Sequence, residues 1–383
     1  MNQILVHMKI IISLLLCMII KTASAQSGKI IDLVKEETHH LPSGTELSIG
    51  VLENGNWTKL GYRLEDGTFI EIKNDDKLFE IGSITKTFTA ALIMKLVGES
   101  EMKLSDPIQK YLPVQMAEDR FQNSTITVQH LITHTSGLSS GPSSFILPYL
   151  RALIFTPKNP NRNFKAKQYY RYLKKFQLNY VPGQQWDYSN AGYGLLGEFA
   201  SDLYGLSWEE SVQEYIFTPL GMRDSYFLID KHNKDSFVVG ITSKGKKSKP
   251  WEMKFANPAG AIKSTLNDMI KYTSAQLAYS PDSIDFFEAT QNPLNFEIMM
   301  PSDKLWEGNA MGLGWWHNLE DNQNTFIWHG GSTGGYTSFV GFSTSNEQAV
   351  VILSNISSSH PSARAKNRIP IPILLGQKLL TEL

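Results

Sequence analysis

Hydrophobic and polar positions alternate in short segments near both ends of the chain. The first group comprises residues 46–52, 57–63 and 68–72, separated by the turn signals Glu-Asn-Gly-Asn and Glu-Asp-Gly. The second group comprises residues 325–329, 336–343 and 348–354. Both groups are rich in β-branched and aromatic residues, so they predict strands.

Helical periodicity dominates the residues between these groups. The predicted helices are residues 83–97, 126–133, 167–176, 193–204, 208–216 and 264–277, with a closing helix over 371–383. This order predicts an α+β fold, in which one mixed, mainly antiparallel sheet is built from both chain ends and is flanked by helices. We expect a sheet domain of residues 26–98 plus 265–383, a mainly helical subdomain of residues 99–264, and a site in the cleft between them.

A short apolar run precedes the predicted fold. Residues Ile10 to Ile20 follow Lys9 and are followed by Lys21-Thr-Ala-Ser-Ala25. This order is typical of a secretory signal peptide of residues 1–25 with cleavage near Ala25, and the run is short for a membrane span. The single cysteine, Cys17, lies inside it. We therefore expect an exported protein, periplasmic or secreted, without disulfide or thiolate chemistry.

The charge balance argues against a nucleic-acid partner. The chain has 36 Lys and Arg against 37 Asp and Glu, a formal net charge of −1, and 42% hydrophobic residues, which is a globular composition. One stretch departs from this balance, because residues 151–175 gather Lys and Arg among aromatic residues. It is interpreted either as a solvated helical face with a loop, or as a basic wall that attracts an anionic substrate, a cell-wall polymer or a membrane surface.

The first motif with candidate chemistry is Ser83-Ile-Thr-Lys86 at the start of a predicted helix. Side chains three positions apart share a helix face, so the amine can lie beside the hydroxyl, and the free N–H groups of the first turn favour negative charge there. A second Ser-x-x-Lys, Ser243 to Lys246, falls in a stretch rich in Lys, Gly and Ser, where no helix would hold the pair.

The second motif is Tyr188-Ser189-Asn190, directly before a predicted helix. A tyrosine near an ammonium group ionises more easily and can shuttle protons, while an asparagine amide can hold both a lysine and a substrate carbonyl. The alternative interpretation is an ordinary aromatic turn with Asn190 as a helix cap.

The third motif is His329-Gly330-Gly331-Ser332, at the end of a predicted strand. Glycines at a strand edge let a substrate lie against the backbone, and the Ser332 N–H could pair with that of Ser83 as an oxyanion hole.

In this order the three motifs resemble those of the penicillin-recognising serine hydrolases, a family that includes class C β-lactamases, D-alanyl-D-alanine carboxypeptidases and related esterases. The resemblance covers most of the chain and implies the β-lactamase/transpeptidase-like fold. Further stretches are similar to the family: Phe79 to Lys86, His130 to Leu138, Pro182-Gly183, Asn257 to Gly260 and Ser264 to Asp268.

The resemblance implies a two-step reaction through a serine ester, without metal or cofactor, on a small molecule or peptide that includes cell-wall peptides. Ser83 would be the acylated nucleophile, and Lys86 and Tyr188 would share the general acid and base work. The implied substrate-orienting residues are Asn190, His329, Gly330 and Gly331, and the implied oxyanion donors are the amides of Ser83 and Ser332.

Two departures from the family pattern bear on the substrate. Class C β-lactamases carry Lys-Thr-Gly where this chain has His329-Gly330-Gly331, which weakens the expected contact with a substrate carboxylate. Residues 138–144 also contain no Gln or Asn for the family's side-chain amide. The resemblance still places β-lactams or D-alanyl peptides first as substrates, small acyl esters second, and a non-catalytic binding protein third.

Two rival sites fit the sequence less well. Two G-x-S-x-G matches lack the context of strand before and helix after that an α/β-hydrolase requires: Gly137 to Gly141 follows a helical segment and runs into Pro142, and Gly330 to Gly334 is followed by a strand-like segment. His130 and His134 have helical spacing for a metal, but the residues between them lack the Glu of H-E-x-x-H, so they are interpreted as a packing motif.

Overall fold

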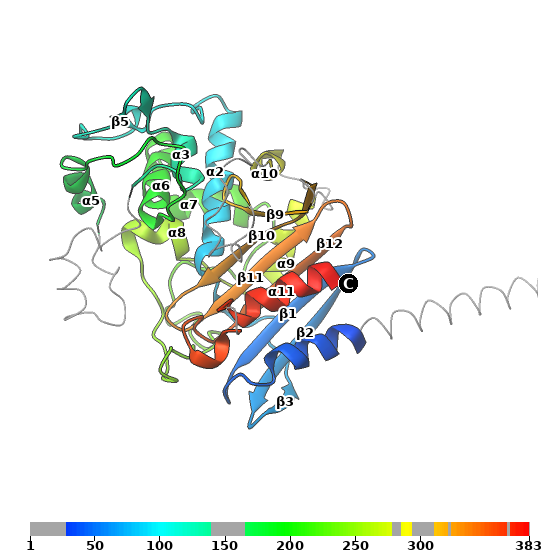
Figure 1. Cartoon of the computed structure of the whole chain (residues 1–383). Coiled ribbons are helices and arrows are strands. Elements are labelled where there is room, and N and C mark those ends of the chain that lie inside the picture. The colour runs from blue at the N-terminus through cyan, green and yellow to red at the C-terminus, as the bar shows by residue number, and fades with distance from the viewer. Residues whose placement is uncertain are drawn as a thin grey trace, which may run out of the picture.

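The computed structural model describes residues 28–138, 165–277, 285–292, 310–320, 323–365 and 368–382. At its centre lies an eight-stranded sheet of order β3-β2-β1-β12-β11-β10-β9-β8, in which neighbouring strands pair antiparallel (Figure 1). Strands of the first group lie beside strands of the second, so the sheet is built from both chain ends as predicted. The strands are β1 (Glu46–Glu53), β2 (Asn56–Glu65), β3 (Thr68–Glu71), β8 (Ala310–Met311), β9 (Trp316–Glu320), β10 (Gln323–Ser332), β11 (Thr337–Ser343) and β12 (Gln348–Ser354).

Two tight turns connect the first three strands. The loops Asn54-Gly55 and Asp66-Gly67 each place both residues at positive φ, between 48° and 77°. Two-residue loops of this kind match the twist of an antiparallel pair, which explains why the predicted turn signals fall there. They fix the register of β1 with β2 and of β2 with β3.

Helices cover both faces of the sheet. A helix over residues 28–38 and α11 (Ile371–Glu382) pack on one face, while α2 (Thr85–Gly98) and α9 (Leu266–Gln276) pack on the other. Six successive residues of β1 are buried as a result, because both its faces meet apolar side chains.

The helical part of the chain packs against the other side of α2. Helix α2 is buried along most of its length, since it contributes side chains to the core beneath the sheet and to the core of the helical part. The other elements of this part are α3 (Val128–Ile132), α5 (Ala166–Leu173), α6 (Asn190–Tyr204), α7 (Trp208–Val212) with a π-helical turn (Gln213–Phe217), and α8 (Asn257–Gly260).

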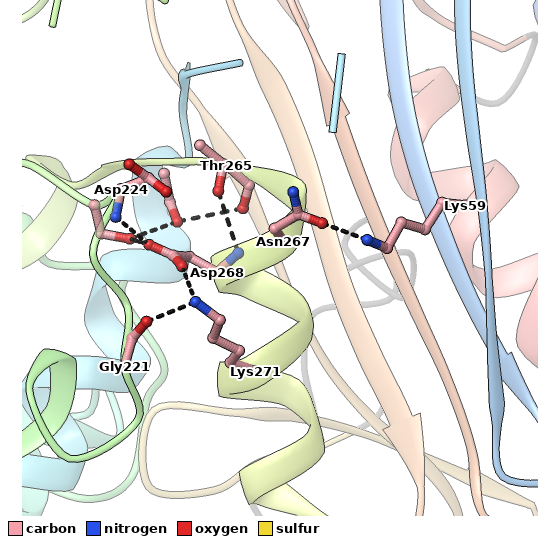
Figure 2. Close-up of polar contacts among 9 residues, drawn as sticks. Lys59, Gly221, Asp224, Thr265, Asn267, Asp268 and Lys271 are labelled. Atoms are coloured by element: carbon pink, nitrogen blue, oxygen red, sulfur yellow. Dashed lines mark hydrogen bonds and ion pairs between the residues drawn. The ribbon is translucent and has the colours of Figure 1, made fainter. Parts of the chain in front are cut away.

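A buried carboxylate ties α9 to the helical part. Asp268 is fully buried and accepts hydrogen bonds from the Asp224 N–H at 2.7 Å, the Ser225 hydroxyl at 2.9 Å and the Lys271 amine at 2.8 Å (Figure 2). The Thr265 hydroxyl caps the same helix by accepting from the Asp268 N–H. A buried charge with this many donors is satisfied, so it stabilises the junction.

The structure confirms the α+β fold and all seven predicted helices, with ends that differ by a few residues. The strands β8 and β9 and the helix over residues 28–38 were not predicted. Both strands are short or carry polar residues among aromatic ones, so alternation gave no clear signal. The expected signal peptide and most of the basic stretch lie outside the described residues. Within the described ranges, every helix is too short or too polar to cross a membrane.

Candidate active site

Ser83 lies where a short strand turns into the buried helix. β4 (Phe79–Glu80) is followed by a 3₁₀ turn (Gly82–Ile84) that continues into α2. Gly82 has φ +51°, and a Cβ there would lie 2.7 Å from the backbone nitrogen of Ser332. Only glycine tolerates both conditions, and this close approach brings the end of β10 against Ser83.

Lys86, on the first turn of α2, lies directly beneath Ser83. Its Nζ is 3.2 Å from Ser83 Oγ, 2.7 Å from Asn190 Oδ1 and 2.9 Å from the carbonyl oxygen of Ala259. The side chain is fully buried, and this burial lowers the pKa of Lys86 well below its usual range. In its neutral form the amine would have two N–H groups for the two acceptor oxygens, and its lone pair would then face the Ser83 hydroxyl.

Tyr188 is the second group in contact with the Ser83 hydroxyl. Its hydroxyl lies 2.7 Å from Ser83 Oγ, and Lys86 Nζ lies 4.6 Å from the centre of its ring. Tyr188 and Asn190 flank the start of α6, where the Ser189 hydroxyl accepts from the Gly192 N–H and is the helix cap. The alternative in which Asn190 caps the helix is wrong, because its side chain binds Lys86 instead.

His134 holds the segment that carries Tyr188. Its Nδ1 accepts from the Ser189 N–H at 3.1 Å, its carbonyl accepts from the Asp187 N–H at 2.8 Å, and its ring centre is 4.4 Å from that of Tyr188. His130 accepts from the Thr127 N–H within a capping box of α3. Both histidines therefore support local structure in the described residues, which agrees with the packing interpretation.

The end of β10 presents its backbone to the same place. Residues His329 to Ser332 pair with β11, whereas the pairing of β10 with β9 reaches only Trp328. A Cβ at Gly331 would lie 1.9 Å from the carbonyl oxygen of Ile81, so glycine is required for the strand to pass the 3₁₀ turn. The Ser332 amide lies beside Gly82 in this arrangement, and the oxyanion hole of Ser83 and Ser332 stays a prediction.

His329 is neutral and offers an acceptor. Its Nδ1 lies 2.7 Å from the carbonyl oxygen of Gly330, so this nitrogen carries the proton. Burial, followed by the charge of Lys86, lowers the pKa of His329 to about 3. The other nitrogen, Nε2, is buried and has no hydrogen-bond partner among the described residues.

These groups surround one cavity of about 640 Å³. The predicted residues that line it are Ser83, Tyr188, Asn190, His329, Gly330, Gly331 and Ser332, while Lys86 lies behind them. Among the described residues, its only charged lining groups are Arg364 and Arg368. The structure thus brings the three motifs together from three distant parts of the chain.

Sequence reasoning missed the aromatic and basic parts of this cavity. Trp186, Trp316 and Trp328 line it, with ring centres 5.4 Å apart for the first two and 6.4 Å for the last two. Trp186 stands two residues before Tyr188, and Trp328 stands one residue before His329. This closeness to the motifs was the sequence signal that could have identified them. Arg364 is oriented by its Nε, which donates to the Ser358 carbonyl at 2.6 Å, and no motif marks it.

Comparisons with known proteins agree with this architecture. The family model described as Beta-lactamase matches residues 46–371. Protein flp of Staphylococcus aureus (strain MW2) is 25% identical over 325 residues, 84% of this chain and 61% of the relative, so the chain spans less than two thirds of that protein.

Two solved structures are also similar. An octameric penicillin-binding protein homologue from Pyrococcus abyssi has a TM-score of 0.73 at 24% identity, over 93% of this chain and 77% of its own. A D-alanine carboxypeptidase from Burkholderia cenocepacia has a TM-score of 0.68 at 20% identity, over 93% and 100%. These likenesses support the same fold.

Proposed function

The chain belongs to the beta-lactamase family of serine hydrolases, and on that premise we propose that Ser83 forms an acyl-enzyme with a β-lactam or a D-alanyl peptide. The observation that carries this proposal is the position of Ser83 Oγ, which lies 3.2 Å from the amine of Lys86 and 2.7 Å from the hydroxyl of Tyr188. A serine hydroxyl becomes a nucleophile when a neighbouring group takes its proton, and here two such groups are in contact with it.

In the acylation step, Ser83 Oγ attacks the substrate carbonyl while its proton passes to the neutral amine of Lys86. The N–H groups of Ser83 and Ser332 would hold the negative charge that develops on the carbonyl oxygen. As the C–N bond breaks, Tyr188 donates its phenolic proton to the leaving nitrogen, and the protonated amine of Lys86 supplies the proton that restores Tyr188. In the second step the same groups take a proton from water, which attacks the ester and releases Ser83.

The anionic end of the substrate would face the arginines. His329 is neutral and presents an acceptor, so it cannot replace the lysine of Lys-Thr-Gly as a partner of a carboxylate. Arg364 and Arg368 line the same cavity and are exposed at its surface. A guanidinium group binds a carboxylate through paired N–H donors, so the charge missing from β10 is supplied from the segment before α11.

A small acyl ester is the second candidate substrate. The neutral His329 and the wall of Trp186, Trp316 and Trp328 favour an apolar acyl or leaving group over a charged one. A non-catalytic binding protein is the remaining candidate, and the contacts of Ser83 with Lys86 and Tyr188 argue against it.

We further propose export, on the basis of the apolar run Ile10 to Ile20. Expression of the full chain in a bacterial host and determination of the N-terminal sequence of the exported protein would test it. A product that begins near Gln26 supports export, and an unprocessed chain in the cytoplasm contradicts it.

The experiment for the function is a time course of intact mass after mixing with a penicillin, a D-alanyl-D-alanine peptide or a nitrophenyl ester. A long-lived adduct that Ser83→Ala lacks indicates a penicillin-binding carboxypeptidase, and a transient adduct with opened drug indicates a β-lactamase. Turnover of the ester alone indicates an esterase. The absence of both an adduct and turnover with all three compounds would contradict a hydrolase.

A further inference from the structure

Trp251 lines the active-site cavity from a segment that has no regular structure of its own. Residues 248–253 run between an isolated bridge, Ile241 with Lys247, and a 3₁₀ turn (Lys254–Ala256). The indole of Trp251 packs against Gly334, two residues after Ser332. A Cβ at Gly334 would lie 2.6 Å from Trp251 Nε1 and 3.2 Å from its Cε2. Trp251 therefore forms the part of the cavity lining that lies next to the residues after Ser332.

Two buried charged residues hold the backbone of Trp251. The Trp251 N–H donates to Glu80 Oε1 at 2.5 Å, and its carbonyl accepts from the Lys263 amine at 2.7 Å. Glu80 and Lys263 are opposite each other in the two-stranded pair of β4 and β7 (Lys263–Ser264), and their exposed fractions are 2% and 1%. Both peptide groups of Trp251 are thus fixed by side chains that start from one rigid pair.

The lysine is satisfied by this arrangement. Besides Trp251, its amine donates to the carbonyls of Phe227 at 3.1 Å and Ala261 at 2.9 Å, so its three protons have three acceptors. Burial raises the pKa of Glu80 and lowers that of Lys263, while the attraction between them opposes both shifts. Burying two charged groups is energetically unfavourable. Neither residue contacts Ser83, so contact with Ser83 does not explain why they are buried.

We infer that Glu80 and Lys263 are positioning residues that set the Trp251 wall, and that this wall limits the size of the substrate group that extends past Ser332. Glu80 stands three residues before Ser83 on the same strand and turn, so one strand pair aligns the nucleophile and the wall together. The inference rests on the proposed hydrolase function for its kinetic test, and a second measurement is independent of turnover.

The kinetic test compares a short and a long nitrophenyl ester, acetate and octanoate. Trp251→Ala and Glu80→Ala should each raise the ratio of kcat/KM for octanoate over acetate roughly tenfold, mainly through KM, because a wall is removed or released. Glu80→Gln keeps an acceptor for the Trp251 N–H and should retain the wild-type ratio. A ratio that changes in Trp251→Ala but not in Glu80→Ala would overturn the positioning role.

Asp268→Asn is the matched control for stability. Asp268 is a buried carboxylate beside a lysine, like Glu80, but it accepts from Asp224 and Ser225. Figure 2 shows its contacts with Asp224 and Lys271, and the residues that line the active-site cavity do not include it. The substitution should lower the Tm about as much as Glu80→Ala and leave the ester ratio unchanged. An equal change of ratio in Asp268→Asn would mean that loss of stability alone explains the effect and would contradict the proposal.

The second measurement uses ¹⁹F NMR of protein labelled with 5-fluorotryptophan, in which Trp251→Phe assigns one of the eight tryptophan signals. The Trp251 signal should shift and broaden in Glu80→Ala and in Lys263→Met, but not in Glu80→Gln or Asp268→Asn. An unmoved signal in the first two variants overturns the proposal even if the protein hydrolyses no ester. A moved signal without any turnover contradicts the proposed function instead and leaves the positioning of Trp251 supported.

Discussion

The ring of His134 lies against the ring of Tyr188, with their centres 4.4 Å apart, and its Nδ1 accepts from the N–H of the next residue, Ser189. His134 is fully buried and has a φ of +60°, a conformation that costs a residue with a side chain some backbone strain. Burial lowers the pKa of His134 well below its usual range, with smaller effects from Lys86 and His329. The neutral ring is what allows Nδ1 to accept.

His134→Ala should therefore reduce kcat/KM by roughly 10²-fold, because Tyr188 loses the ring that it packs against and the following residue, Ser189, loses its hydrogen-bond acceptor. His134→Asn keeps an acceptor near the position of Nδ1 and should recover a large part of the loss. Steady-state kinetics with a penicillin or an ester measures both. If the asparagine variant is no better than the alanine variant, the contact with Ser189 does not position Tyr188.

Gly82→Ala should abolish acylation while the chain still folds. The added Cβ would lie 2.7 Å from the Ser332 nitrogen in a backbone of φ +51°, so β10 or the turn that carries Ser83 must move. Intact mass after mixing with a penicillin reports the acylation, and circular dichroism reports the fold. Gly55→Ala is the control, since that turn has a positive φ but open space and lies in a distant hairpin. Wild-type acylation in Gly82→Ala would contradict the close approach.

Much of this site could be predicted from the sequence because its motifs are short and local. Ser83 and Lys86 are on one helical turn, and His329 to Ser332 are on one strand, so their spacing alone predicts a shared direction. The contacts of Lys86 with Asn190 and Ala259 span more than a hundred residues and depend on how α2, α6 and α8 pack. No pattern in a single sequence encodes those distances.

The residues that were missed are those whose role comes only from packing. Arg364 reaches the cavity because Ser358 accepts from its Nε, and Trp251 because Glu80 and Lys263 hold its backbone. Each is an unremarkable residue in its own segment. Strand β9 was missed for a similar reason, since its tryptophan, Trp316, lines a cavity formed with distant elements.

The pH dependence of activity should follow Lys86. The proposed acylation needs the neutral amine of Lys86, and burial lowers its pKa, so kcat/KM should fall as the pH drops through that lowered pKa. A pH profile of kcat/KM for a neutral ester measures it. Protonation of a histidine would also make kcat/KM fall toward low pH. His329→Asn is therefore the control and should leave that fall in place. Disappearance of the fall in that variant would assign it to His329.

The lowered pKa of Lys86 should also make the free energy of unfolding depend on pH. Because folding lowers the pKa of Lys86 from its ordinary 10.5, the unfolded chain binds one more proton between the native pKa and 10.5. The free energy of unfolding should then rise with pH in that window, by about 1.4 kcal/mol per pH unit, relative to Lys86→Met. Urea unfolding of both proteins at several pH values measures the difference. A constant difference would mean that Lys86 is charged when folded.

The basic stretch makes a separate prediction about an anionic cell-wall polymer. Its described part exposes Lys167, Arg171, Lys174 and Lys175 along and after α5, while Tyr169 and Leu173 are buried beneath them. Replacing the four charges by Gln should weaken binding to such a polymer at low salt and have less effect at high salt. Sedimentation with cell-wall preparations measures it. Unchanged binding at low salt would return the stretch to a solvated helical face.

The two arginines of the cavity make the most direct test of substrate choice. If a substrate carboxylate faces them, Arg364→Gln and Arg368→Gln together should raise KM for a penicillin roughly tenfold, with kcat less affected, and should leave a neutral nitrophenyl ester unchanged. Adding His329→Lys would place a cation on β10 and should restore part of the affinity. An equal loss with penicillin and neutral ester would mean that the arginines shape the cavity without binding the anion, and the ester would then be the better candidate for the natural substrate.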